Sequence, residues 1–455
     1  MMYNLAIIGG GPAGYTAAAM ASNAGMRTVI FEKEQLGGTC LNVGCIPTKT
    51  LLYSAKQYHN ALAAGKYGVD VEAVKFNFQK MQQRKQKVVR KLVAGVKQRL
   101  QNENCQLVAA EAKLMFHNSD KVVIEAAGET FEAERLLICT GSVNFVPPIE
   151  GIHDNDAVWD STAALAATEL PASIVIVGGG VIGMEFATLF SELGSRVTVI
   201  EAMPRILPQL DTECVDILQD KYRKNGVNIL TSTKVTRIDG NRVYFVAEGT
   251  EEQVIDADKI LVSVGRRANL SGLDNLKVEM QRGAVRVNDM MQTSEKNIFA
   301  AGDVTGKIML AHVASRQAEV AVGYMLKQIP LQRIAYNAIP SVVYTNPEIA
   351  SVGLTESDLT GKDCVLPIEF VVKKLPMTFS GRFVAENEGE TGLCKLIVDK
   401  SKKTILGVHA IGNPCSEFIA AASFAVRMGY TLPEFEQVVF PHPTVSEILR
   451  ETALI

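Results

Sequence analysis

Two cysteines separated by four residues are the first feature of this chain that could support redox or nucleophilic chemistry. They are Cys40 and Cys45, in the stretch GTCLNVGCIPTK at residues 38–49. Zinc ligand pairs and the tighter redox pairs usually leave two residues between the sulfurs, so this spacing matches neither pattern. Pro47 suits the first turn of a helix, which would place Cys45 at a positive helix end that stabilises a thiolate. Two unrelated cysteines are the alternative.

A histidine close to the end of the sequence is the second candidate for chemistry. His442 lies in PHPTVSE and precedes Pro443, which disfavours helical geometry at the residue before it. We therefore expect a turn at His442 and a helix after it. A histidine titrates near neutral pH, and the carboxylate of Glu447 could hold one ring nitrogen while the other accepts a proton. A structural histidine is the alternative.

The composition excludes several classes of function. The 455 residues include 46 Lys and Arg against 49 Asp and Glu, so the net charge of −3 predicts no binding to nucleic acid or to an anionic membrane. No stretch reaches the roughly 18 apolar residues of a membrane span, and the first residues lack the features of a secretory signal. We expect a soluble cytoplasmic protein of roughly three domains without a metal site. In a reducing compartment a disulfide is more often catalytic than structural.

An internal repeat organises the chain. The stretch LAIIGGGPAG predicts a buried strand that enters a Gly-x-Gly-x-x-Gly turn and a helix, after which a second strand ends in an acid. Such glycines let the backbone approach a pyrophosphate at a helix N-terminus, and the acid binds ribose hydroxyls. The sequence therefore predicts two dinucleotide sites. The first contains Gly9, Gly11, Gly14 and Glu32, and the second, displaced by 169 positions, contains Gly178, Gly180, Gly183 and Glu201.

Each copy of the repeat closes on an apolar strand that ends in glycine, at 135–142 and at 259–266. The first copy is longer, and its extra length contains the cysteine pair and a polar helix expected over 78–104, with eight Lys and Arg. A solvated helix face is the first interpretation of that run, and a docking surface for an acidic partner is the alternative. A third strand signal at 297–303 ends in Asp303, a candidate for binding a cofactor hydroxyl or, alternatively, a helix cap.

Together these motifs resemble the flavin-dependent pyridine-nucleotide disulfide oxidoreductases along essentially the whole chain. The stretches that carry the resemblance are GGGPAG, GGTCLNVGCIPTK, CTGS, GGGVIGME, AAGD, MLAH and PHPTVSE. The resemblance implies an α/β fold with two Rossmann-like domains, for FAD and NAD, and a C-terminal α+β dimerisation domain. The expected bounds are 1–146 for the first part of the FAD domain, 147–266 for the NAD domain, 267–336 for the return to the FAD domain and 337–455 for the dimerisation domain.

The resemblance also implies roles for individual residues. Cys40 and Cys45 would form a redox disulfide across a flexible link at residues 42–44, with Cys45 as the charge-transfer thiolate against the flavin and Cys40 as the interchange thiol. In this family the acid–base histidine comes from the other subunit of a homodimer, which assigns that role to His442 with Glu447. Lys49 would lie near flavin N5, paired with Glu185. The expected cofactor-binding residues are Gly9, Gly11, Gly14, Glu32, Lys49, Thr140, Gly141, Asp303, Leu310, Ala311, His312, Gly178, Gly180, Gly183, Glu185, Glu201 and Gly265.

Within the family, the chain is most similar to the branch that oxidises protein-bound dihydrolipoamide to lipoamide and reduces NAD⁺. The lipoyl-bearing protein of a 2-oxoacid dehydrogenase or of a glycine-cleavage system is the expected partner. Glu201 favours NAD over NADP, although Arg205 is nearby, and Val181 stands where glutathione-reducing relatives carry a tyrosine. Phe440 and Pro441 depart from the usual motif before the histidine and alter the mouth of the dithiol site. A glutathione-reductase-like enzyme and a non-catalytic scaffold subunit are the alternatives.

Overall fold

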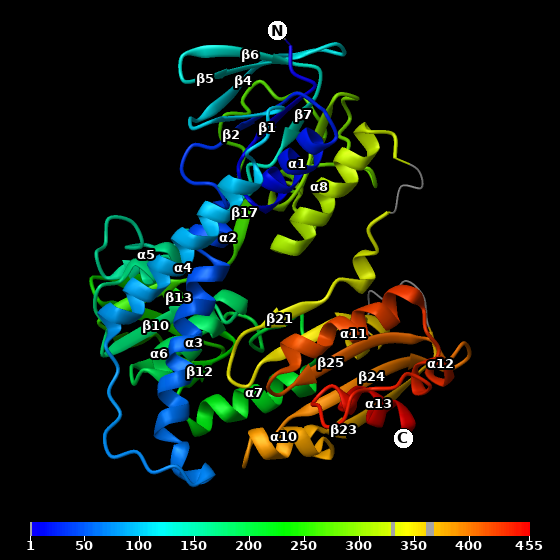
Figure 1. Ribbon diagram of the computed structural model, residues 1–455. Coiled ribbons are helices and arrows are strands. Elements are labelled where there is room, and N and C mark those ends of the chain that lie inside the picture. Colours follow the sequence, from blue (N-terminus) through cyan, green and yellow to red (C-terminus); the bar gives the residue numbers. More distant parts are fainter. Residues whose placement is uncertain (1, 329–332, 361–367) are drawn as a thin grey trace. The chain divides into compact units, whose positions relative to one another are not determined.

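The computed structural model describes residues 2–328, 333–360 and 368–455, which form two compact units (Figure 1). Among the residues described, none of the helices combines the length and the apolar composition that crossing a bilayer requires. The sequence-based domain bounds remain predictions. Unit 1 contains residues 1–50, 79–146 and 265–334, and unit 2 contains residues 51–78, 147–264 and 335–455.

Unit 1 is built on a parallel sheet with the strand order β20-β7-β1-β2-β3. All strands except the edge strand β3 are fully buried, and apart from Thr28 they are apolar, as expected for a parallel sheet that helices cover. The strands are β1 (Leu5–Ile8), β2 (Thr28–Phe31), β3 (Cys105–Val108), β7 (Leu136–Ile138) and β20 (Ile298–Ala300).

Helices and small antiparallel sheets complete unit 1. Helix α1 (Pro12–Asn23) starts with a proline, whose missing N–H costs nothing there, and packs beside α8 (Ala311–Met325). The other helices are α2 (Gly38–Asn42), α3 (Cys45–Leu62, in this unit as far as Thr50) and α4 (Phe78–Arg99, in this unit from Gln79). The other strands are β4 (Ala112–His117), β5 (Val122–Ala126), β6 (Glu129–Ala133), β8 (Ser142–Asn144), β17 (Arg266–Ala268), β18 (Met280–Gln281) and β19 (Ala284–Val285).

The polar helix expected over 78–104 is shorter than predicted, because α4 ends at Arg99. The chain then turns before β3. The side chain of Asn102 accepts a hydrogen bond from Asn104 N (2.8 Å), and Cys105 N donates to Asn102 O (3.0 Å). An asparagine that bonds the backbone two residues on offers the chain a turn in place of a further helical turn.

Unit 2 contains a second parallel sheet, with the strand order β12-β11-β10-β16-β9. Helix α6 (Val181–Glu192) follows β10 as α1 follows β1. The strands are β9 (Val158–Trp159), β10 (Ser173–Val177), β11 (Arg196–Ile200), β12 (Asn228–Leu230) and β16 (Lys259–Val262). Helices α5 (Ser161–Ala166) and α7 (Thr212–Lys224) and the antiparallel strands β13 (Thr233–Asp239), β14 (Arg242–Ala247) and β15 (Gln253–Asp256) belong to the same part of the chain.

The C-terminal part of unit 2 is an antiparallel sheet with the order β21-β22-β25-β24-β23, and α11 (Cys415–Met428) packs on β22 and β25. Its strands are β21 (Ser341–Val343), β22 (Ile349–Gly353), β23 (Phe370–Pro376), β24 (Leu393–Asp399) and β25 (Ile405–Ile411). The remaining helices are α9 (Glu356–Thr360), α10 (Gly381–Glu386), α12 (Leu432–Glu436) and α13 (Glu447–Leu454).

The two parallel sheets share one strand order. In that order β3, β2, β1 and β7 correspond to β12, β11, β10 and β16, and the last place is taken by β20 in unit 1 and by β9 in unit 2. The last strand of the first sheet therefore comes from a segment that follows the second sheet in the sequence. The predicted α/β class, with two Rossmann-like sheets and a C-terminal α+β part, is confirmed.

Candidate functional site

The glycines of the first repeat form a turn at the N-terminus of α1. Gly9 has a positive φ of 107°, and a Cβ there would lie 2.2 Å from the carbonyl oxygen of Cys139. A Cβ on Gly14 would lie 1.8 Å from Gly9 O. At Gly11, by contrast, the one nearby atom is Gly38 Cα at 3.8 Å, so this glycine faces open space. Packing thus requires the outer two glycines, and the middle one leaves room for a phosphate to approach the backbone.

The second repeat has the same construction at the N-terminus of α6. A Cβ on Gly178 would meet Ser263 O at 2.7 Å, and one on Gly183 would meet Gly178 O at 2.0 Å. Gly180 has no atom within 4 Å of that position. Neither α1 nor α6 has a side-chain cap or an acid in its first turn, so nothing there competes for an anion. Both turns fit the pyrophosphate of a dinucleotide.

The two predicted acids make equivalent hydrogen bonds. Glu32 Oε2 accepts from Gly10 N at 2.7 Å, and Glu201 Oε2 accepts from Gly179 N at 2.6 Å. The second oxygen of each acid accepts from the amide two residues further on, at 2.8 Å for Glu32 and 2.7 Å for Glu201. The offset of 169 positions therefore also holds for hydrogen bonds. Each carboxylate is fixed beside its glycine turn, where ribose hydroxyls would lie.

Arg205, which could have favoured a 2′-phosphate, is directed elsewhere. Its guanidinium donates to Leu210 O at 2.6 Å and also bonds the hydroxyl of Thr212. The Glu201 carboxylate is held by backbone amides. The negative charge at this strand end is therefore not neutralised by Arg205.

The two cysteines lie at the junction of two helices. Cys40 is in α2, and Cys45 is the first residue of α3, at its positive end. The Cys40 thiol is hydrogen-bonded to Cys45, and this bond together with burial raises the pKa of Cys40 well above its ordinary value. The Cys40 sulfur therefore keeps its proton, whereas the helix end favours negative charge on the Cys45 sulfur.

The expected flexible link between the cysteines is shorter than predicted. Asn42 is the last residue of α2, and its side-chain amide donates to Leu36 O at 3.1 Å and Gly38 O at 3.0 Å. These bonds fix Asn42 against the preceding turn. Only Val43 and Gly44 connect the two helices.

Lys49 is half-buried in α3, one turn after Cys45, and its charge acts to lower the pKa of the Cys40 thiol. Glu185, its predicted partner, is buried in α6 of unit 2 and accepts a hydrogen bond from Tyr344 N at 3.1 Å. Because the two residues belong to different units, their pairing remains a prediction.

Asp303 follows β20 and is part of a chain of hydrogen bonds within unit 1. Its Oδ2 accepts from Ser142 Oγ at 2.6 Å, and Ser142 Oγ accepts from Arg266 Nε at 2.8 Å. Neither Ser142 nor Arg266 was among the residues selected from the sequence, although each directly follows one of the closing glycines, Gly141 and Gly265. These hydrogen bonds fix one carboxylate oxygen of Asp303, so the carboxylate has a defined orientation.

The closing glycines have positive φ values, 71° at Gly141 and 120° at Gly265. No atom lies within 4 Å of where their Cβ atoms would be, so the conformation alone requires glycine. Gly265 is the first residue of the segment 265–334, which belongs to unit 1. Thr140 Oγ1 donates to Asn269 O at 2.6 Å, which fixes the backbone before Gly141.

Three further predicted residues lie at the N-terminus of α8. Leu310 is the extended residue before the helix, Ala311 is its first residue, and His312 is exposed in the first turn. The helix has no side-chain cap, so its first amides could donate to a ligand. Nearby, the fully buried Gln317 accepts from Gly302 N at 2.7 Å and so ties α8 to the strand end that precedes Asp303.

His442 and Glu447 lie close together at the end of unit 2. His442 Nδ1 is 2.9 Å from Glu447 Oε1, and Glu447 Oε2 accepts from Thr444 N at 2.8 Å. The Thr444 amide and the histidine hold the pKa of Glu447 below its ordinary value. Phe440, one of the two residues that depart from the usual motif, packs edge-on against Phe435 with ring centroids 5.8 Å apart, which anchors the loop to the core.

Comparisons with known proteins agree on one family. The model of the pyridine nucleotide-disulphide oxidoreductases matches residues 3–318, and the model of their dimerisation domain matches residues 339–453. A dihydrolipoyl dehydrogenase of Mycoplasma pneumoniae is 38% identical over 456 residues, covering 99% of this chain and 98% of the relative. One from Bacillus subtilis is 37% identical, with coverage of 99% and 97%.

Two solved structures have a similar fold over the full chain. LpdA from Mycobacterium tuberculosis superposes with a TM-score of 0.90 at 25% identity, covering 99% of both chains. The HOCl-induced flavoprotein disulfide reductase RclA from Escherichia coli superposes with a TM-score of 0.85 at 29% identity, covering 100% of both chains.

Proposed function

The chain belongs to the pyridine nucleotide-disulphide oxidoreductase family, and from this premise we propose that it oxidises protein-borne dihydrolipoyl groups and reduces NAD⁺. Members of this family depend on FAD and a pyridine nucleotide. The observation that carries the proposal is the hydrogen-bonded Cys40–Cys45 pair at the start of α3, in the same unit as the first glycine turn. Relatives named dihydrolipoyl dehydrogenase, at 36–38% identity, support the choice of substrate.

The cysteines perform a thiol–disulfide exchange. In the oxidised enzyme they form a disulfide, and a substrate thiolate attacks the Cys40 sulfur, breaks the Cys40–Cys45 bond and leaves a thiolate on Cys45. The second substrate thiol then displaces Cys40, which takes up a proton, and the substrate leaves as a cyclic disulfide. FAD, when bound, supplies the relay of two electrons from the dithiol to NAD⁺.

His442 supplies and removes the proton in this exchange. The matched dimerisation domain implies a homodimer, and in the proposal each site takes its histidine from the partner subunit. Glu447 holds Nδ1, so that Nε2 can accept a proton from the substrate dithiol and make the attacking thiolate. Thr444 N fixes the other oxygen of Glu447, so the carboxylate keeps its orientation while the ring gains and loses charge.

Two sets of residues would hold the cofactors, one for FAD and one for NAD. The first glycine turn, Glu32 and the α8 N-terminus would bind FAD, with Asp303 as an acceptor for its hydroxyls. The second glycine turn and Glu201 would bind NAD. NAD is the proposed nicotinamide cofactor because the Glu201 carboxylate would repel a 2′-phosphate and Arg205 is engaged by Leu210 and Thr212.

Reduction of another disulfide is the second candidate function. The structural similarity to RclA, a disulfide reductase, favours it, whereas Glu201 and Val181 weigh against a glutathione-reducing, NADP-dependent enzyme. Steady-state assays with dihydrolipoamide and NAD⁺, and with glutathione disulfide and NADH or NADPH, separate the two. We expect dihydrolipoamide with NAD⁺ to give the highest kcat/KM. A higher value for glutathione disulfide would overturn the proposal.

A further inference from the structure

Helix α4 concentrates positive charge. Its 22 residues, Phe78–Arg99, include eight Lys and Arg and no Asp or Glu. The whole chain has a small excess of acids, 49 against 46, so the helix is a local exception. Like charges three or four residues apart on a helix weaken it. The run of cations therefore destabilises the helix, and the proposed chemistry gives no reason for it.

Seven of the eight cations lie on the exposed side of an amphipathic helix, and the eighth, Lys85, is buried. Phe78, Gln82 and Lys85 are buried. The exposed cations Lys80, Arg84, Lys87 and Lys91 follow the spacing i, i+4, i+7 and i+11, which places them along one stripe. Exposed Arg90, Lys97 and Arg99 extend the charged surface toward the end of the helix.

Five of these cations have no acidic partner among the residues that the structure describes: Lys87, Arg90, Lys91, Lys97 and Arg99. Elsewhere on the surface, cations are commonly paired. Arg286, for example, lies 2.6 Å from Glu279, and Lys374 lies 2.6 Å from Glu213. The positive charge of Lys87, Arg90 and Lys91 is therefore not neutralised within the described chain. These three residues, together with the stripe neighbours Lys80 and Arg84, define the basic face of α4.

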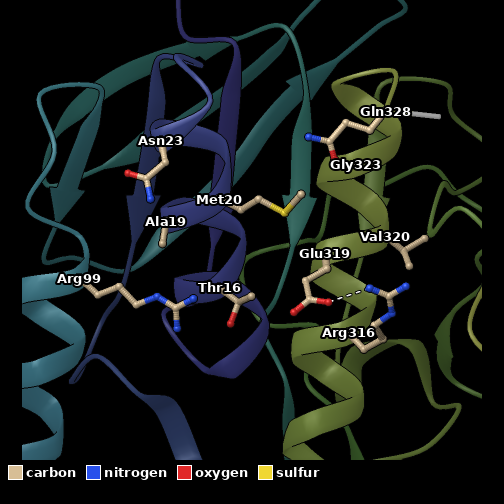
Figure 2. A pocket seen from close by; sticks show the side chains of 10 residues that line it. All are labelled: Thr16, Ala19, Met20, Asn23, Arg99, Arg316, Glu319, Val320, Gly323 and Gln328. Carbon is tan, nitrogen blue, oxygen red and sulfur yellow. Dashed lines mark hydrogen bonds and ion pairs between the residues drawn. The ribbon is translucent and has the colours of Figure 1, made fainter. Parts of the chain in front are cut away.

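Two residues of α4, Arg84 and Arg99, lie next to helices α3 and α1 of unit 1. Arg84 Nη1 donates to Thr50 O at 2.8 Å, and Thr50 lies in α3, five residues after Cys45. At the C-terminal end of α4, Arg99 faces α1, where it lines a pocket of about 440 Å³ together with Thr16 (Figure 2). Tyr15 lies within electrostatic reach of both Arg99 and Cys40.

We propose that the basic face of α4 is a docking surface for an acidic carrier domain, the protein that brings a dithiol to Cys40. This inference rests on the proposed function, because it assumes a protein-borne substrate. Complementary charge at an exposed surface steers association and orients the partner before close contact forms. A carrier that docks on α4 would place its dithiol arm close to the helix that begins with Cys45.

The chemistry of the surface favours a protein over other polyanions. The one aromatic residue of α4, Phe78, is buried, so the helix offers no exposed ring on which a nucleic acid base could stack. Leu92 is the one large apolar side chain of α4 that is exposed, which is too little to insert into a membrane. An acidic protein surface requires neither feature.

Two matched double variants test the proposal. Lys87→Glu with Lys91→Glu reverses the centre of the basic face, and Lys113→Glu with Lys277→Glu reverses two exposed lysines elsewhere in unit 1. The probe is a recombinant lipoylated carrier domain of net negative charge. We expect the first variant to bind it about tenfold more weakly at low ionic strength, with a flatter salt dependence, and the control to bind as the wild type does. Turnover of free dihydrolipoamide should be unchanged in both.

The outcomes separate docking from catalysis. Equal affinity of the two variants for the carrier domain would overturn the docking surface. So would a change of oligomeric state in the first variant alone, measured by sedimentation, because the face would then belong to the homodimer. Weaker binding of RNA or anionic vesicles, with carrier binding unchanged, would assign the face to another partner. The first variant could lose carrier binding while even the wild-type enzyme fails to oxidise free dihydrolipoamide. That result would support the docking surface and refute the proposed function.

Discussion

His442 and Glu447 form a hydrogen-bonded pair in which Nδ1 of the ring lies 2.9 Å from Oε1 of the carboxylate. The histidine side chain is 82% exposed and the glutamate side chain 24%, so the acid is the fixed member and the ring is the accessible one. Because Thr444 N also holds the carboxylate, Glu447 can orient the ring without moving. In the proposed mechanism, this accessible ring acts as the base for a substrate bound at the partner subunit.

Replacing either member of this pair should impair one half of the reaction. We expect Glu447→Gln to slow dithiol oxidation about 10-fold to 100-fold, and His442→Gln to slow it further, because the first loses the orienting charge and the second the base. Reduction of an artificial dye by NADH bypasses the dithiol and should be nearly unchanged. Equal losses in the two assays would contradict the assigned role, and His153→Gln, at another exposed histidine, is the control.

Neutralising Glu201 should relax the choice of nicotinamide cofactor. In Glu201→Gln the negative charge beside Gly179 is removed, so a 2′-phosphate is no longer repelled. The ratio of kcat/KM for NAD to that for NADP should fall about tenfold, which corresponds to about 1.4 kcal/mol. The internal repeat provides a matched control, because Glu32→Gln changes the equivalent acid of the first site. A ratio that moves equally in both variants would refute the assignment.

Stability should depend on pH through Glu192, which ends α6. Burial raises the pKa of Glu192 to about 7, against a hydrogen bond from Asn346 Nδ2 at 2.6 Å that acts to lower it. Between pH 4.5 and about 7, the folded state therefore holds a proton that the unfolded state has released. The stabilisation that this proton gives the folded state is full below pH 4.5 and is lost as the pH rises to about 7. A glutamine stays neutral at every pH and keeps an oxygen for Asn346.

Glu192→Gln should consequently raise the melting temperature by a few degrees at pH 8 and have little effect near pH 4.5. Thermal unfolding at both pH values measures this difference. Glu251→Gln, at an exposed acid, is the control and should change neither value. The same shift at both pH values would show that ionisation of Glu192 is not its cause.

The repeat made the two glycine turns predictable from sequence. Glycine spacing and a terminal acid describe a local structure in which the acid follows the glycine that donates to it by 22 residues, so the bonds of Glu32 and Glu201 to their turns follow from the pattern. The proximity of His442 and Glu447 is local for the same reason. The predicted ends of helices were less accurate. The helix expected to reach residue 104 ends at Arg99, because the turn at Asn102 competes with further helix.

Long-range contacts could not be predicted. Asp303, Ser142 and Arg266 meet only because strand ends from distant parts of the chain converge, and no local pattern connects them. Lys395 is a further example. It is buried and bonds Asp211 at 2.9 Å, Glu213 at 2.5 Å and Glu356 at 2.7 Å, so four charges stabilise one another in unit 2. Burying such a group alone would be unfavourable, but the sequence does not show where its partners lie.

The pairing of the two cysteines with a flavin is tested by anaerobic reduction of the purified enzyme with dihydrolipoamide. The yellow protein should develop a long-wavelength absorbance band from a thiolate beside the flavin. Cys40→Ser should retain FAD and show the band without added reductant, because it leaves Cys45 as a thiolate, whereas Cys45→Ser should bind FAD and never show it. A band in Cys45→Ser, or none in the reduced wild-type enzyme, would contradict the proposed relay.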